Sequence, residues 1–596
     1  MANLINQKDL DFLLYHVLDA QSLTSAAHYQ DHDKTTFDEV LKTSARIAED
    51  YFLPHNAKAD ANEPQFDGKK VTTIDEVKTA WQHFCDSGIL SARHSYDDGG
   101  MQLPAVIHSA CNAYFLSANP STAAYPFLTS AAANVIHAFG SEAQKNTYLP
   151  HMLSGRFSGT MALTEPDVGS SLGDLTTKAI PQDDGTYRIK GQKMYISGGD
   201  QDITENIVHL VLARIEGAPK GVKGISLFIV PKVHTNEDGS LGERNDVNLA
   251  GLLHKMGYRG TTSTVLTFGE KDNCHGYLIG EPHKGLGYMF KMMNEARIGV
   301  GLGAAMIGYR GYLESLEYAK NRPQGRAPDD KDPNSKPLNI IEHADVKRLL
   351  LTQKSYVEGA MALCLFGSRL VDEQEALDNQ DSGILLDLLT PIIKSFPSKY
   401  GPMANDLAIQ VLGGSGYIRE YPVEQCYRDN RLNPIHEGTE GIQSLDLLGR
   451  KLWMEKGKGL QLLLGRIQAT LEAASACPEL KALCEVFQNH LTTFNKTTTF
   501  LGKTLQAGDS KQALANSVLY LDMMGKVVVS WLWLEMASKA TNVFGESKDE
   551  QDKAYLAGKL QAARYFITWE LPQIEHQAQI LTTLDRTCLD TQTDWF

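Results

Sequence analysis

The chain has 596 residues, of which 42% are apolar and 22% are charged. This composition is typical of soluble globular proteins, and the length is too great for one hydrophobic core, so about three or four domains are expected. The formal net charge of −15 argues against a nucleic-acid partner, which usually contacts a basic surface, although a local basic patch would be compatible with it.

Cysteine usage and hydropathy indicate the compartment. The eight cysteines are scattered without a C-x-x-C pair, which favours reduced thiols over a disulfide framework or a zinc site. The N-terminus lacks the basic region of a signal peptide. The most apolar long segment, Val518 to Leu534, contains Asp522 and Lys526, so we expect a buried helix rather than a membrane span. We therefore expect a cytoplasmic protein with no integral membrane segment.

Residues 34–158 are predicted to form an N-terminal helical domain. Apolar residues recur at helical spacing from Thr35 to Leu53, and Thr36 is the expected N-cap. Further along, Pro120 and Pro126 are expected to break a helical region.

Residues 159–275 are predicted to form a middle β domain, because short β-branched runs alternate with turn residues. Its entry, Met161 to Asp174, places Thr164 and Ser170 around a Pro-Asp turn. Hydroxyls and amides in such a turn could hold a heterocycle edge or an anion. An ordinary turn with satisfied serines is the alternative.

Within the same domain, Tyr195 and Ser197 are expected on one face of a strand, because side chains alternate along strands. An aromatic ring beside a hydroxyl suits stacking on, and hydrogen bonding to, a ring system. More commonly such a pair is only a half-buried strand face.

Residues 285–452 are predicted to form a helical-bundle domain. Its first helical stretch carries five glycines, each costing about 1 kcal/mol relative to alanine, which suggests close approach of another backbone or a flat ligand. A Rossmann fingerprint fails because Met306 stands where the third glycine is needed. Arg322 and Arg326 follow and are candidate phosphate ligands, with solvated surface arginines as the alternative.

The same domain ends in the most informative segment, Gln410 to Gln443. Its glycine cluster could let backbone amides approach a phosphate closely. Glu437 lies in an apolar run beside a glycine, which would give a carboxylate the raised pKa and access of a general base. The alternative is a helix-capping or surface carboxylate. A zincin motif fails because Glu440 stands where histidine is required.

Residues 456–596 are predicted to form a further helical domain. Its helices are amphipathic and rich in tryptophan, but the segment carries no chemical motif. We expect it to pack on the core or on a partner subunit.

Taken together, these segments resemble the acyl-CoA dehydrogenase family. The motifs TEPDVGSS, KMYISGG, KMGYRGTTSTVLTF, NEARIGVG, NRPQGR and GGSGYIREYPVEQCYRD…IHEGTEGIQ occur in the family's order. The likeness extends to the long subgroup with an extra C-terminal helical domain, which includes 3-methylmercaptopropionyl-CoA dehydrogenases. It implies an α+β chain with a helical domain, a β-barrel or sandwich, a four-helix bundle and the additional helical domain.

The resemblance also implies a reaction. FAD would lie between the β domain and the bundle, Glu437 would remove the α-proton of an acyl-CoA, and flavin N5 would accept the β-hydride, giving a trans-2-enoyl-CoA. Electrons would pass to an electron-transfer flavoprotein, and the protein would be a homodimer or homotetramer. An acyl-CoA oxidase using O2 is a close alternative, and a DNA-associated flavoprotein of the same fold is a more distant one. The residues do not distinguish straight, branched, methylthio or aromatic acyl groups.

Matched position by position, the resemblance assigns roles to further residues and implies no metal ligand. Leu163 and Thr164 would touch the flavin pyrimidine edge, Tyr195 and Ser197 its rings, and Thr439 its adenosine or pyrophosphate part. Residues reaching the FAD of a neighbouring subunit would be Arg322, Gln324, Gln410, Gly413 and Gly414. Ser170 and Asn294 would contact the CoA arm of the substrate, and Ser170 would also contact the cofactor. Arg297 and Gly438 would contact the substrate beside the base.

Some positions depart from the family pattern. Ser171 stands where an acidic residue is common, and Tyr195 where tryptophan is common. The RPQGR loop replaces Arg-x-x-Phe-Gly, and Gly441 replaces a frequent glutamine. These departures concern the cofactor contacts and the substrate shape and leave the base in place.

Overall fold

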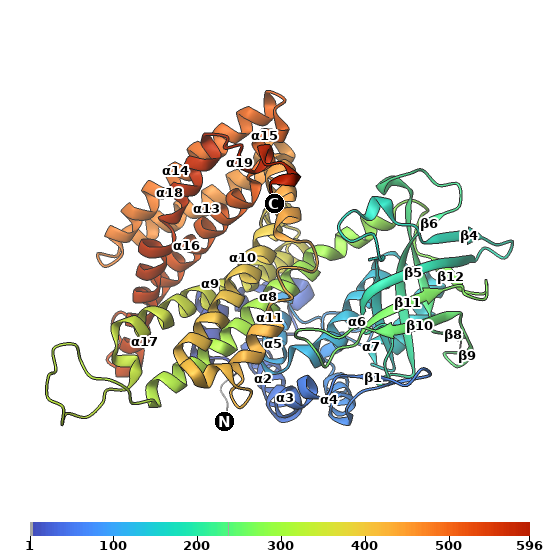
Figure 1. Cartoon of the computed structure of the whole chain (residues 1–596), viewed down its shortest axis with the longest axis horizontal. Helices are drawn as coiled ribbons and strands as arrows, with labels where there is room; N and C mark the ends of the chain where they lie inside the picture. Colours follow the sequence, from blue (N-terminus) through green and yellow to red (C-terminus); the bar gives the residue numbers. More distant parts are fainter. Residues whose placement is uncertain (1–3, 237) are drawn as a thin grey trace.

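A computed structural model of the chain describes residues 4–236 and 238–596, apart from the side chains of residues 290–294. The chain folds into a sheet region, a central bundle of long helices, an N-terminal helical region beside both, and a C-terminal group of helices (Figure 1). The α+β architecture expected from the sequence is therefore confirmed.

The N-terminal helical region differs in two details from the sequence pattern. The N-cap of its first long helix is Asp33, and Thr36 is the N3 partner in a reciprocal capping box. Pro120 starts a helix and Pro126 lies inside it, so neither breaks the helix: the first needs no backbone donor, and Pro126 is buried against neighbouring elements. The region comprises α2 (Lys34–Ile47), α3 (Asn56–Ala61), α4 (Asp75–Asp86), α5 (Ala105–Ala118), α6 (Pro120–Phe139), α7 (Glu142–Leu153) and the hairpin β1 (Gln65–Phe66) and β2 (Val71–Thr72).

The segment that precedes this region is also structured. It begins with α1 (Gln7–Asp11) and a π-helical turn (Phe12–Val17), and its apolar side chains are buried in the main core. The hydrogen bonds that attach it to the rest of the molecule include those from Ser117 Oγ to the carbonyl of Leu4 (2.9 Å) and from Arg369 Nε to the carbonyl of Leu18 (3.1 Å).

The middle region is a mostly antiparallel sheet in which the strand order is β10-β11-β5-β12-β7-β6-β3, with β4 pairing β5 and β6. Only β3–β6 and β4–β6 pair in parallel among the described strands. One face packs on α6 and α7, and a second apolar cluster covers the other. The strands are β3 (Phe157–Ala162), β4 (Lys178–Pro181), β5 (Tyr187–Ser197), β6 (Asn206–Ile215), β7 (Ile225–Pro231), β10 (Val247–Leu252), β11 (Ser263–Phe268) and β12 (His275–Leu278), with the separate pair β8 (Val233–Thr235) and β9 (Leu241–Arg244).

The bundle is built on three long helices, and the glycine-rich stretch lies within the first of them. A Cβ placed at Gly301 would lie 2.1 Å from the carbonyl oxygen of Ile393, and one at Gly308 would lie 3.1 Å from the Cα of Gly401. The prediction that these glycines admit another backbone is confirmed at both positions. The helices are α8 (Gly285–Asn321), α9 (Ala344–Ala376), α10 (Gln380–Leu412), α11 (Val423–Asn430) and α12 (Glu440–Gly449).

The C-terminal region packs on the bundle through buried charges. Lys559 Nζ contacts the carboxylates of Asp9 and Glu358, and Asp522 Oδ1 accepts a hydrogen bond from Tyr400 at 2.8 Å. The helices are α13 (Lys458–Ser475), α14 (Lys481–Gln506), α15 (Ser510–Ala515), α16 (Ser517–Phe544), α17 (Glu550–Tyr565), α18 (Gln573–Thr582) and α19 (Thr587–Asp590).

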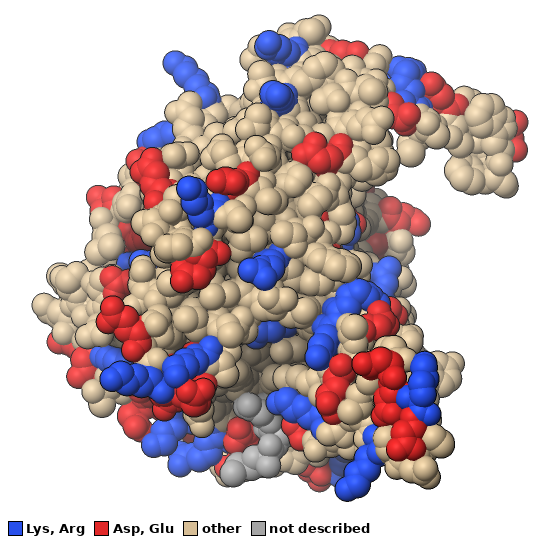
Figure 2. Space-filling model, turned by 90° about the vertical axis from the view of Figure 1, so that its left-hand side faces the viewer, with Lys and Arg blue, Asp and Glu red and all other residues tan. Residues whose placement is uncertain are grey.

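Among the described residues, α16 alone is long and apolar enough to cross a membrane by length and composition. Within its most apolar window, 89% of the residues are buried inside the protein. Such burial is typical of the core helix of a globular domain. On the face in Figure 2, basic and acidic side chains are interspersed, and no large area of one sign is visible.

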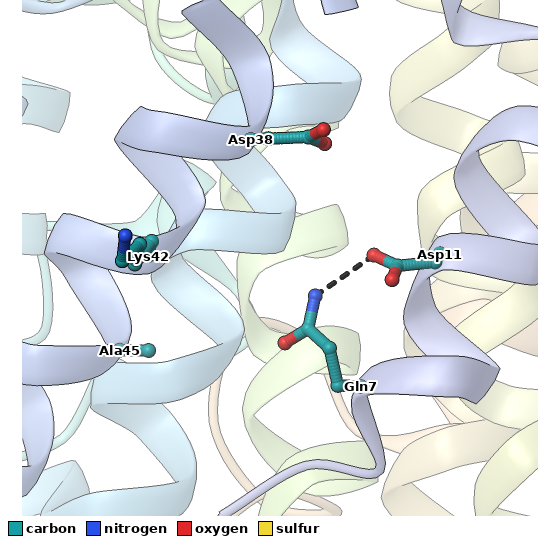
Figure 3. A pocket seen from close by; sticks show the side chains of 5 residues that line it. All are labelled: Gln7, Asp11, Asp38, Lys42 and Ala45. Atoms are coloured by element: carbon teal, nitrogen blue, oxygen red, sulfur yellow. Dashed lines mark hydrogen bonds between the residues drawn. The ribbon is translucent and has the colours of Figure 1, made fainter. Parts of the chain in front are cut away.

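A cavity of about 400 Å³ lies between α1 and α2 (Figure 3). Gln7 and Asp11 line one side and are joined by a 2.8 Å hydrogen bond, while Asp38, Lys42 and Ala45 line the other. None of the residues predicted for the functional site lines it.

Candidate active site

Glu437 lies in a tight turn between α11 and α12. Its φ of +54° is unusual for a residue other than glycine, and Gly438 follows with φ of +90°. Such a backbone persists only when neighbouring groups hold it. Lys394 of α10 supplies two of these contacts, because its Nζ donates to the carbonyls of Asn433 and Gly438, each at 2.8 Å. Gln443 Nε2 donates to the carbonyl of Glu437 itself at 3.0 Å.

Buried asparagines join this turn to the bundle. Asn433 Nδ2 donates to Asn430 Oδ1 at 2.8 Å. Asn430 in turn donates to the carbonyl of Ala304 on α8 and to Asn405 Oδ1 on α10. The turn that carries the candidate base is therefore attached to both α8 and α10.

The β domain is joined to the same place. The backbone N–H of Tyr258, in the β10–β11 loop, donates to Asp429 Oδ1 at 2.6 Å. A Cβ at Gly257 would lie 2.4 Å from the carbonyl oxygen of Arg428, so this loop needs a glycine to lie against α11. Sheet and bundle thus meet beside the turn that carries Glu437.

The electrostatic surroundings favour a weakly acidic Glu437. Burial raises the pKa of its carboxyl group, and the positive charges of Arg297 and Lys394 only partly oppose this. Arg297 is itself paired with Asp446 (3.0 Å), and its Nε has no hydrogen-bond partner among the described residues. Burial lowers the pKa of the neighbouring His436 to about 3, so this imidazole is neutral. A half-buried carboxylate with a raised pKa is suited to general-base chemistry.

At the sheet, a buried ion pair positions the predicted cofactor residues. Lys193 Nζ lies 3.0 Å from Glu165 Oε1 and donates to the carbonyl of Leu163 at 2.9 Å. The carbonyl of Thr164 accepts from the N–H of Met194 at 2.9 Å. The end of β3 is thereby held against β5.

Tyr195 lies at an irregularity in β5. Its φ is +61°, its side chain is 63% exposed, and the register with β11 shifts at this point. Ser197, opposite Ser263, is half-buried. The irregularity directs the tyrosine away from the sheet core. Tyr195 and Ser197 lie at the end of β5, just after Lys193 and Met194, which contact Leu163 and Thr164.

A third group lies where α10 ends. Gln410, Gly413 and Gly414 are exposed, and a Cβ at either glycine would meet no described atom within 4 Å. Only the φ of +59° at Gly413 demands glycine within this chain. The open space beside Gly414 is available to a molecule outside the chain.

The loop after α8 leaves some predicted ligands exposed and uses another internally. Arg322 and Gln324 are exposed, and the Gln324 carbonyl lies 2.7 Å from His343 Nε2. Arg326 donates to the carbonyls of Ser335 and Pro333, so it braces its own loop.

Three residues of the predicted site remain: Ser170, Thr439 and Asn294. Ser170 is exposed in the turn after β3, and Thr439 is the N-cap of α12. The side chain of Asn294 lies outside the described residues. Sequence reasoning missed Lys394, although a lysine within the apolar run Pro391 to Pro397 is an unusual signal for a buried helix position.

Family profiles match nearly the whole chain. The profiles described as the acyl-CoA dehydrogenase N-terminal, middle and C-terminal domains match residues 35–156, 160–270 and 283–452, respectively. One described as acetyl-CoA dehydrogenase C-terminal like matches residues 463–592.

Curated relatives are similar over their full length. A 3-methylmercaptopropionyl-CoA dehydrogenase of Ruegeria pomeroyi is 35% identical over 94% of both chains. A broad-specificity linear acyl-CoA dehydrogenase of Mycobacterium tuberculosis is 32% identical over 98% of both, and a butyryl-CoA dehydrogenase of Syntrophomonas wolfei is 32% identical over 100% of this chain and 99% of its own. In fold, the chain is similar to an acyl-CoA dehydrogenase of Bacillus anthracis solved with FAD (TM-score 0.75, 22% identity, 94% of this chain and 91% of that chain).

Proposed function

Since this chain belongs to the acyl-CoA dehydrogenase family, we propose that it oxidises an acyl-CoA thioester to the trans-2-enoyl-CoA, with Glu437 as the base and FAD as the cofactor. The observation that carries this proposal is the turn at Glu437, where a carboxylate of raised pKa is held in a strained backbone by the bundle and lies beside the sheet.

The residues present fit a flavin dinucleotide. Tyr195 is exposed and lies two residues before Ser197, at the end of β5. The N-terminus of α12, capped by Thr439, suits the anionic pyrophosphate. When bound, the flavin supplies the two-electron acceptor for the substrate β-hydride.

The protein's own part in the reaction is proton removal and positioning. The α-proton of a thioester is weakly acidic, so a base with a raised pKa matches the task better than an ordinary carboxylate. The C–H electron pair is left on the substrate as the proton moves to Glu437, and negative charge develops on the thioester oxygen. The N–H of Glu437 is the donor that the family resemblance assigns to that oxygen.

Two further parts of the proposal concern a second subunit and the electron acceptor. Gln410, Gly413, Gly414 and Arg322 face open space, as expected if they contact the cofactor of a second subunit in a homodimer or homotetramer. Electrons would leave to an electron-transfer flavoprotein, since the curated relatives above are named as dehydrogenases. Their names differ in the acyl group, so the proposal covers acyl-CoA thioesters as a class.

The test compares two adjacent carboxylates. The purified protein should show a flavin spectrum that short, branched or methylthio acyl-CoA thioesters bleach. Glu437→Gln should keep the flavin and slow bleaching by about 10²–10⁴-fold or more. Glu440→Gln is the matched control, because Glu440 is a neighbouring carboxylate on α12 that pairs with Lys399, and it should bleach at nearly the normal rate. Normal bleaching by Glu437→Gln would refute the proposed mechanism.

A further inference from the structure

Three side chains of metal-ligating type meet in the N-terminal helical region, and none of them belongs to the active site proposed above. His94 and Asp98 come from the segment before α5, and His137 comes from the last turn of α6. Their donor atoms all lie within 4.8 Å of one another. His137 Nε2 is 3.3 Å from Asp98 Oδ2, and the two imidazole rings meet edge to face with centroids 5.2 Å apart.

His94 has one ring nitrogen that is buried and without a hydrogen-bond partner among the described residues. Only 8% of the residue's surface is exposed, and the unpartnered nitrogen is Nε2. Leaving a buried polar atom unpaired is unfavourable, so the atom needs an explanation.

A polar side chain of α6 lies beside His94. His94 has a hydrogen bond with Asn134, which lies one turn before His137 on α6. Asn134 Nδ2 donates to Glu295 at 3.3 Å, which holds the amide beside the histidine. With its proton on the other ring nitrogen, the imidazole has a lone pair on Nε2, the atom that is buried and unpartnered. This is the state in which histidine binds a metal.

The other groups around the cluster are arranged for a cation. Ser95 Oγ donates to Asp98 Oδ2 at 2.6 Å and orients the carboxylate. Arg93 is close to His94, but Glu295 and Glu375 each pair with it at 3.0 Å. Two carboxylates therefore balance this arginine, and Asp98 adds a further negative charge.

We propose that His94 Nε2, His137 Nε2 and the carboxylate of Asp98 bind a divalent transition-metal ion of the zinc class. Two imidazoles and one carboxylate suit zinc rather than calcium or magnesium, which prefer oxygen ligands. Tetrahedral zinc with bonds of about 2.0–2.1 Å separates its ligands by about 3.3 Å, which is the spacing of His137 and Asp98. These two side chains are exposed and can move toward His94, and water would fill the fourth position.

The site would have a structural consequence. It would join the segment before α5, which carries Gly99 and Gly100, to the end of α6. The segment before α5 supplies two ligands and α6 the third, so the ion would cross-link elements that are separate in the sequence. Bound metal would therefore raise the melting temperature of the folded protein.

The test measures metal binding by the flavin-loaded full-length protein after chelator treatment and chelator removal. Titration with Zn2+ against a chromophoric competitor should show one site. His137→Ala and Asp98→Asn change exposed residues and should each weaken binding by about 100-fold or more, and Asn134→Ala should weaken it by about tenfold. Co2+ in place of zinc should give the visible absorption of a tetrahedral ion, which His137→Ala should abolish.

A matched control distinguishes a built site from surface binding. His254 is an exposed histidine whose Nδ1 lies 3.0 Å from Glu63, a pair without a buried third ligand. His254→Ala should leave the affinity and the zinc-dependent rise in melting temperature unchanged. Equal zinc binding by wild type and His137→Ala, or no stoichiometric binding by wild type, would overturn the proposal.

Discussion

Lys394→Met tests how the turn that carries Glu437 is held. The ammonium of Lys394 is buried, and it bonds two carbonyls on either side of the base, at Asn433 and Gly438. It is also one of two cations that lower the pKa of Glu437. Methionine has a similar length and apolar stem, so the substitution removes the charge and both hydrogen bonds with little change of volume.

The expected loss of stability is modest. Burial lowers the pKa of Lys394 from 10.5 to about 8, so the site disfavours the ammonium by roughly 3 kcal/mol. Removing the charge relieves this cost, while each carbonyl left without a donor costs about 1–3 kcal/mol. The two carbonyls together cost about 2–6 kcal/mol and the relieved charge offsets roughly 3 kcal/mol of this, so we expect the free energy of unfolding to fall by at most about 3 kcal/mol.

The catalytic effect should be larger and should depend on pH. Glu437 acts as a carboxylate, so the rate falls as pH drops through its pKa. Without Lys394 that pKa rises further, and the acidic limb of the rate profile moves to higher pH. A displaced turn should also lower the rate on the plateau by about 10–100-fold.

The assay is the rate of flavin bleaching by a saturating acyl-CoA across pH, with urea denaturation alongside. Lys526→Met is the control, because Lys526 is a buried lysine of the C-terminal region that pairs with Asp522 at 2.5 Å. It should lose stability and keep the acidic limb of wild type. An unchanged limb in Lys394→Met, or a shift to lower pH, would refute the reasoning.

Two other substitutions test the site's backbone and its ion pair. Gly438→Ala places a Cβ 2.6 Å from Gln443 Nε2 at a φ of +90°, so the free energy of unfolding should fall by about 1–3 kcal/mol and bleaching should be slower. Gly441→Ala lies in α12 with no described atom nearer than 3.9 Å, so its free energy of unfolding should stay unchanged or rise by up to about 1 kcal/mol. Equal stabilities of the two variants would contradict this. Although burial opposes it, Lys193 and two threonines lower the pKa of Glu165 to about 2. The ionised Glu165 therefore stabilises the fold above a pH of about 4.5, and this stabilisation is lost as pH falls toward 2. Glu165→Gln should reduce the pH dependence of the free energy of unfolding across that range, and it should lower that free energy by about 3–5 kcal/mol at neutral pH.

Local sequence patterns predicted the features that depend on residues close together along the chain. The change of period near residue 159 predicted the sheet, because a half-buried strand must alternate and a helix must repeat every three or four residues. The glycines of α8 predicted close contact with another backbone, and Gly301 and Gly308 make it. Glu437 stood out because an apolar run and a glycine surround it.

Local pattern was wrong where other contacts compensate for a weak position. Pro126 lies inside α6, although a proline removes a helical hydrogen bond, since the helix is held by burial along its length. Thr36 has the residue type of an N-cap, but Asp33 takes that position and Thr36 completes the capping box.

The sequence by itself determined the α+β architecture, the family and the identity of the candidate base. Tertiary structure alone decided what surrounds that base: Lys394 lies far from Glu437 in the chain, and only the packing of α10 brings its ammonium to the turn. The same holds for His94 and His137, whose ring nitrogens converge only when α6 folds back on the segment before α5. A pKa, a strained turn or a metal site depends on atoms within a few ångströms, and no spacing along the chain specifies such neighbours.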